Sequence, residues 1–142
     1  TVGGESRPVQ VRSGTRCITL VRGDVGQEVI FSASARHLGQ VDSEATDSEP
    51  FVVEATSRPK ISLSQSGKNV IVTIKVSSGQ QVGRVTFTKT KSRSVVLRPV
   101  NGKYLITVKP SDVGKKIVVK AFAMKNGYFP SATVSSRAWT IR

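Results

Sequence analysis

Residue types that build catalytic and metal sites are scarce in this chain of 142 residues. It has one cysteine, Cys17, and one histidine, His37. A single cysteine cannot form an internal disulfide, and the usual zinc ligand sets need a second histidine or cysteine. The same scarcity leaves no set of nucleophile, base and orienting group for catalysis. We therefore expect a protein that is not an enzyme, with no cofactor and no metal site.

Long apolar runs are also missing. None approaches the roughly 18 residues that cross a bilayer as a helix, so we expect no transmembrane segment. There is neither a signal peptide nor an initiating Met, and we interpret the chain as a mature or excised fragment. Aromatic residues make up only 6%, and no RNP-like or helix-turn-helix pattern is present. Nucleic acid is therefore disfavoured as a partner.

The residues that are present favour strands. Val, Ile, Thr and Phe alternate with polar residues, and no long helical period occurs, which places the chain in the all-β class. We expect a loose arm at residues 1–9 and then strands at residues 9–11, 16–21, 27–35 and 50–55. In the third of these strands the alternation puts four residues on the buried side, namely Val29, Phe31, Ala33 and Ala35.

The second part of the chain shows more strands at closer spacing. Its expected strands are residues 61–63, 69–76, 84–90, 95–100, 104–108, 117–124 and a closing strand with Trp139 and Ile141. Asn101-Gly102 is a strong hairpin signal between two of them. Seven short strands in about 84 residues predict an immunoglobulin-like or fibronectin-like β-sandwich.

An internal repeat organises the chain. Asp24-Val25-Gly26 and Asp112-Val113-Gly114 lie 88 positions apart, and at this shift residues 6–54 fall without a gap onto residues 94–142. Such a period is too long for a solenoid and suits tandem modules. We expect a partial module at residues 1–58 and a complete, basic module at residues 59–142. The partial module lacks the equivalent of residues 60–94, which was removed or is supplied by another chain or segment.

Charge divides at the same place. Residues 1–58 carry six Arg, no Lys and eight acids, a net charge of −2. Residues 59–142 carry sixteen Lys and Arg and a single acid, Asp112, a net charge of +15. Such a field attracts polyanions in a salt-dependent way, although it does not identify them. The candidate residues for binding a polyanion or a partner are Lys89, Lys91, Arg93, Lys115, Lys116, Lys120, Lys125, Tyr128 and Phe129.

Residues 104–136 resemble the bacterial Ig-like repeats of large secreted and surface proteins. The resemblance rests on a tyrosine strand, the corner Asp112-Val113-Gly114-Lys115, the turn Gly127-Tyr128 and a Ser-rich last strand. It covers the last 40 or so residues well, residues 14–54 more weakly and residues 60–94 hardly at all. It implies a sandwich that serves as spacer, stalk or adhesive module at the cell surface or outside the cell, without catalytic residues.

The repeated Asp-Val-Gly predicts a structural turn. Asp24 and Asp112 can accept hydrogen bonds from backbone N–H groups, while Gly26 and Gly114 can adopt a positive φ. As the only acid of its module, Asp112 could suggest catalysis, but its twin Asp24 in a different charge context favours the turn.

Further residues could have a structural or a binding role. The acidic cluster of Asp42, Glu44, Asp47 and Glu49 is a solvated loop, a docking site for a basic module or, least favoured, a calcium site. His37 is expected at the surface and Cys17 as a small buried hydrophobe. Tyr128 and Phe129 either pack at the module end or contact a sugar or partner.

These patterns predict a structural or adhesive function. We expect modules of an extracellular or cell-surface assembly that associate through charge complementarity and strand completion, with neighbouring modules or other proteins as partners. The alternative is a binding module for an anionic cell-wall polymer or glycan.

Overall fold

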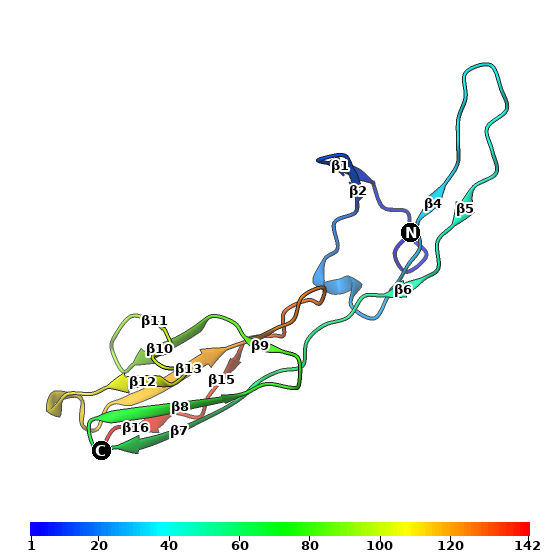
Figure 1. Cartoon of the computed structure of the whole chain (residues 1–142). Coiled ribbons are helices and arrows are strands. Elements are labelled where there is room, and N and C mark those ends of the chain that lie inside the picture. The colour runs from blue at the N-terminus through cyan, green and yellow to red at the C-terminus, as the bar shows by residue number, and fades with distance from the viewer. The chain divides into compact units, whose positions relative to one another are not determined.

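Strands dominate the chain in the computed structural model, which describes all 142 residues (Figure 1). The only helices are single 3-10 turns, η1 (Arg22–Asp24) and η2 (Pro110–Asp112). All the strand pairs are antiparallel, and the predicted all-β class is confirmed. No helix is long and apolar enough to span a membrane.

The chain divides into two units, Thr1–Glu54 (unit 1) and Ala55–Arg142 (unit 2). The boundary between these units lies slightly before the boundary predicted from the change in composition near residue 58. Ala55 and Thr56 belong to unit 2 because both contact Phe129: Ala55 forms a parallel bridge with it, and the Thr56 N–H donates to its carbonyl at 2.9 Å.

Unit 2 contains two main sheets. One has the order β12-β8-β7, formed by β7 (Lys60–Ser66), β8 (Asn69–Lys75) and β12 (Tyr104–Thr107). In the other, β13 (Lys116–Ala121) pairs with β10 (Val85–Lys89), β15 (Val134–Ser135) and β16 (Trp139–Thr140), and β11 (Val95–Leu97) adds to β10. A small third sheet joins β9 (Gln81–Val82) to β14 (Ala123–Met124).

One hydrophobic core joins the two main sheets. In β8 the predicted alternation holds, because Val70 and Val72 are buried while Thr73 and Lys75 are exposed. Because β-branched side chains alternate along these strands, each sheet presents an apolar face to the core. The core residues are Val70, Val72, Val85, Leu97, Ile106, Val108, Ile117, Val119, Ala121 and Ile141.

Unit 1 contains six short strands and little core. β1 (Gln10–Arg12) pairs with β2 (Thr15–Cys17), β3 (Glu28–Val29) with β6 (Phe51–Val52), and β4 (Ser32–Ala33) with β5 (Thr46–Asp47). Its buried hydrophobic residues are Val2, Val29 and Val53. Residues 60–88 of unit 2 have no equivalent within residues 1–54 at the shift of 88 positions.

The backbone of unit 1 repeats that of unit 2 at the shift seen in the sequence. The pair Val29↔Phe51 recurs as Ile117↔Trp139, and Ala33↔Thr46 recurs as Ala121↔Val134. The Gly26 N–H donates to the Val53 carbonyl at 2.8 Å, as the Gly114 N–H does to Ile141 at 2.8 Å. The internal repeat is therefore a repeat of structure as well as of sequence.

The hairpin signal at Asn101-Gly102 also has its counterpart in unit 1. Asn101 and Gly102 have φ of 49° and 72°, and Ser13 and Gly14 have φ of 48° and 78°. Two successive positive φ values are typical of the tight turns that join antiparallel strands. In unit 2 this turn closes an antiparallel bridge between the flanking residues 100 and 103.

Two expectations about the backbone of unit 1 are wrong. Residues 1–9 are not a loose arm, because Val2 is buried and bridges Val29. Residues 27–35 are not one half-buried strand: they form β3 and β4, and of the four residues expected inside only Val29 is buried. Phe31 is 36% exposed although its equivalent Val119 is fully buried, because unit 1 has no counterparts of β7 and β8.

Candidate functional site

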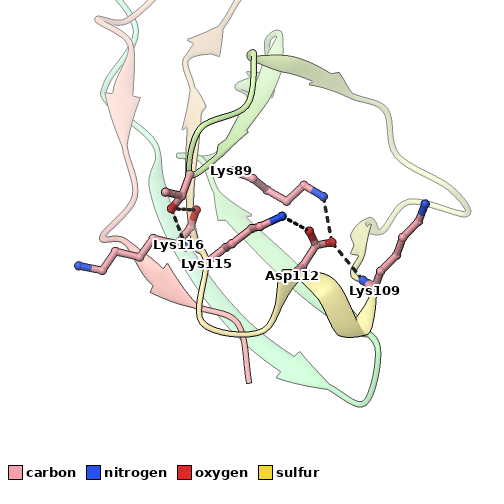
Figure 2. A network of polar contacts seen from close by, with 6 residues as sticks. Lys89, Lys109, Asp112, Lys115 and Lys116 are labelled. Atoms are coloured by element: carbon pink, nitrogen blue, oxygen red, sulfur yellow. Dashed lines mark hydrogen bonds and ion pairs between the residues drawn. The ribbon is translucent and has the colours of Figure 1, made fainter.

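The 3-10 turn η2 places a buried carboxylate among lysines (Figure 2). Asp112 Oδ2 accepts hydrogen bonds from the Lys109 backbone N–H at 3.1 Å and from Lys89 Nζ at 3.0 Å. Asp112 Oδ1 accepts from Lys115 Nζ at 3.0 Å. Asp112 is 4% exposed, so two ammonium groups and one amide satisfy a carboxylate that water scarcely reaches.

These donors favour the charged form of Asp112. The backbone hydrogen bond from Lys109 lowers the pKa of the carboxyl most, followed by the hydrogen bonds from Lys89 and Lys115. Desolvation opposes this shift but is weaker, so the pKa lies well below its usual value. Asp112 is therefore ionised at neutral pH, which does not suit a general acid or base.

Asp24 holds the equivalent turn in unit 1. Its Oδ2 accepts from the Val21 backbone N–H at 2.8 Å, as Asp112 does from Lys109, and its ion pair is with Arg7 at 2.8 Å. The bond to the residue three positions earlier recurs, while the cationic partners differ in position and type. The two modules therefore share the turn, in which each aspartate accepts a hydrogen bond from the N–H of the residue three positions before it.

The glycine of each turn has a left-handed backbone. Gly26 has φ of 86° and Gly114 has φ of 85°. Residues with a Cβ rarely adopt such values, so glycine is favoured at both positions. Asp24, Gly26, Asp112 and Gly114 therefore lie together in two matching turns, with no ligand or substrate needed to explain them.

A basic groove lies beside η2. Its lining residues come from two loops and are Thr90, Lys91, Ser92, Val113, Gly114 and Lys115. The loops are joined at Thr90, whose N–H donates to the Lys116 carbonyl at 3.0 Å and whose hydroxyl accepts from the Lys116 N–H at 2.9 Å. Lys91 and Lys116 have no ion-pair partner, and Figure 2 shows the Lys116 ammonium directed away from Asp112.

A second groove adjoins the first and shares Val113 with it. Its lining includes the cationic residues Lys68, Lys109 and Arg142, together with Gly67, Val108 and Pro110. One end of unit 2 therefore presents several cations, and its one carboxylate, Asp112, pairs with only two of them.

The structure does not gather every predicted basic residue at this end. Lys89, Lys91, Lys115 and Lys116 lie together around η2 and the basic groove. Arg93 is exposed in the loop that follows Ser92. Lys120 lies further along β13, opposite Thr86 and Ser135. Lys125 lies in the turn after β14, with its Nζ 4.1 Å from the centre of the Tyr128 ring.

Tyr128 and Phe129 are half-buried. The Phe129 carbonyl accepts from Thr56 Oγ1 at 3.1 Å, and this hydroxyl also donates to the Ala123 carbonyl at 2.9 Å. Thr56 was not among the candidate residues predicted from the sequence. The only feature of the sequence that marks it is its position just after the last strand of the repeat.

The acidic cluster is exposed. Asp42 pairs with Arg36 at 2.9 Å, and Asp47 in β5 accepts a hydrogen bond from the Ser32 hydroxyl. Glu44 and Glu49 are exposed nearby in sequence. No group of three or more His, Cys, Asp or Glu residues is placed to hold a metal ion.

The single histidine and the single cysteine make only local contacts. His37 is exposed, with Nδ1 3.1 Å from the Leu38 carbonyl oxygen. Cys17 was expected to be buried, but it is only half-buried, and its thiol lies 3.6 Å from the Gln10 carbonyl oxygen. Its equivalent in unit 2, Leu105, is not buried either and is 38% exposed.

Comparison with protein-family models, with curated proteins and with solved structures finds no match to this chain.

Proposed function

We propose that this chain is a non-enzymatic structural or adhesive protein, made of Ig-like β-sandwich modules of an extracellular or cell-surface assembly. The observation that carries this proposal is the structural repeat. The same strand pairs, turns and hydrogen bonds occur twice, 88 positions apart. Tandem copies of one β-module extend a chain and present surfaces at regular intervals, which suits a stalk or an adhesive array.

Charge supports association between neighbouring molecules. The acidic residues 1–58 and the basic residues 59–142 give each molecule two oppositely charged parts. Opposite charges orient partners and raise their rate of encounter, and salt screens them over a distance of about 10 Å at 0.1 M ionic strength. The proposed assembly therefore joins the basic part of one molecule to the acidic part of the next, and strand completion of unit 1 adds to it.

Light scattering of the full chain at low and high salt tests this proposal. We expect an assembly at low salt that dissociates as salt rises. The variant Lys91→Glu/Lys116→Glu removes two unpaired cations and should weaken the assembly. The matched control Lys60→Glu/Lys75→Glu changes the net charge by the same amount. Lys60 and Lys75 lie opposite each other at the end of β7 and β8 that is away from the hairpin joining these strands. A monomer of the unmodified chain at every salt concentration would refute charge-guided assembly.

The basic groove favours a second candidate function, the binding of an anionic cell-wall polymer or glycan. Lys91 and Lys115 line the groove together with the hydroxyl-bearing residues Thr90 and Ser92, and Lys116 lies beside it. Cations and hydroxyl groups are the donors that phosphate and carboxylate groups accept from. Retention on immobilised polyphosphate and polygalacturonate tests this function. Retention should fall in Lys91→Glu/Lys116→Glu and persist in Lys60→Glu/Lys75→Glu, and equal loss in both variants would refute a specific groove.

A further inference from the structure

Unit 1 has an unpaired backbone edge, formed by the residues that follow β2, at a position that is covered in unit 2. Residues 16–20 are equivalent to residues 104–108, where β12 pairs with β8 through Ile106↔Val70 and Tyr104↔Val72. The Val108 N–H continues this pairing by donating to the Lys68 carbonyl at 2.8 Å. In unit 1, Ile18, Thr19 and Leu20 make no backbone hydrogen bond. Such an edge is a template for one more strand.

A groove lined by both apolar and polar residues lies beside this edge. It is lined by Thr1, Ser6, Arg7, Val9, Ile18, Ile30, Phe31 and Ser32. Val9 is 51% exposed and Phe31 is 36% exposed, whereas their equivalents in unit 2 are the core residues Leu97 and Val119, at 9% and 0%. Val70 and Val72 of β8 belong to the same core as Leu97 and Val119. Unit 2 thus shows which kind of strand covers these positions.

We propose that unit 1 binds an extended strand with β-branched apolar residues at alternate positions, added antiparallel to residues 16–20. By analogy with β8, one of these residues lies opposite Ile18 and the next lies opposite Arg16. Backbone hydrogen bonds hold the strand, and the alternate side chains enter the groove. This inference rests on the proposed function, because it specifies the strand completion assumed there.

Two features narrow the chemistry of the added strand. β8 is bounded by cations, Lys68 before it and Lys75 at its end, and residues 1–58 are net acidic, so a strand with basic ends is favoured. Arg16 occupies the position of Tyr104. The residue of the added strand that lies opposite Arg16 therefore contacts the Arg16 side chain, whereas in unit 2 Val72 of β8 lies opposite the Tyr104 ring. A strand of this pattern matches residues 66–77 of the chain itself, which supplies the probe.

Amide hydrogen exchange of the full chain, with and without a synthetic peptide of residues 66–77, tests the proposal. Exchange at Ile18 and Leu20 should slow about tenfold when about nine-tenths of the chain is bound, since only the free fraction exchanges. The Thr19 N–H points away from the added strand, because only alternate N–H groups of an antiparallel strand face the same neighbour. The amides of β12 should not change, because β8 already covers that edge. A peptide with Asp in place of Val70 and Val72 is the control, and it should give no protection.

Two chain variants localise the effect. Ile18 lines the groove and Thr19, next to it, is exposed, so Ile18→Asp should abolish protection while Thr19→Asp should retain it. A fusion that places a copy of residues 59–88 directly before Thr1 supplies the strand in cis at a high effective concentration. It should protect the same amides even if the free peptide is poorly soluble. Unprotected amides at Ile18 and Leu20 with both the peptide and the fusion would overturn the inference.

The outcomes separate this inference from the proposed function. A chain that remains monomeric at every salt concentration but gains peptide-dependent protection refutes charge-guided assembly and supports strand binding. A chain that assembles in a salt-dependent way, with the Ile18 and Leu20 amides unprotected by peptide or fusion, refutes strand binding alone.

Discussion

Replacing Gly114 by alanine isolates the backbone geometry of the repeated turn. Gly114 has φ of +85°, and a Cβ added to it would meet no heavy atom within 4 Å. The expected loss therefore comes from the left-handed conformation, which costs a residue with a Cβ about 1–2 kcal/mol. Alanine also restricts the unfolded chain, which offsets about 0.4–1 kcal/mol of this cost. We expect Gly114→Ala to lower the free energy of unfolding by about 1 kcal/mol.

Thermal unfolding followed by the fluorescence of Trp139 measures this change. Trp139 is the only tryptophan, and it belongs to unit 2. For a domain of this size, a loss of about 1 kcal/mol lowers Tm by about 4–8 °C. The control Ser111→Ala changes an exposed residue of the same turn and should alter stability by less than about 0.5 kcal/mol. An unchanged Tm in Gly114→Ala would refute the strain argument, and a loss several times larger would refute the inference that the site has open space.

Three further predictions concern unit 2 and use the same fluorescence. In Gly83→Ala the new Cβ would lie 2.3 Å from the Phe122 ring, so we expect an overpacking loss of about 1–3 kcal/mol, and a neutral variant would show that the ring moves freely. Ile117→Ala empties a fully buried site and should cost about 2–5 kcal/mol; a cost below 1 kcal/mol would contradict a shared core. Because the pKa of Asp112 is lowered below its usual 3.8, its ionised form stabilises the fold fully above about pH 4, and this contribution is lost as pH falls further. Tm should therefore drop between pH 5 and acidic pH near 2 by less in Asp112→Asn than in the unmodified chain, and equal drops would refute this role.

The repeat was predictable from the sequence because its signals are local. Asp112 and Gly114 recur at a fixed shift from Asp24 and Gly26, and a turn depends on the φ values and hydrogen bonds of a few consecutive residues. The all-β class follows from alternation for the same reason, since side chains point to opposite faces at every second residue. The candidate lysines could be predicted from the charge of the sequence, but the sequence did not show which of them lie together in space.

Burial could not be predicted from these local patterns. Phe31 and Val119 occupy equivalent positions in equivalent strands, yet one is exposed and the other is fully buried. What differs is the presence of β8, whose residues are remote in sequence from Val119. In the same way, Lys89 contacts Asp112 because β10 pairs with β13, whereas Lys115 contacts it from three positions along the same segment. The sequence by itself determined the strand pattern, the repeat and the separation of charge, because these depend on neighbours along the chain. Only the tertiary structure decided which apolar faces are covered and which cations remain unpaired, because both depend on contacts between distant segments.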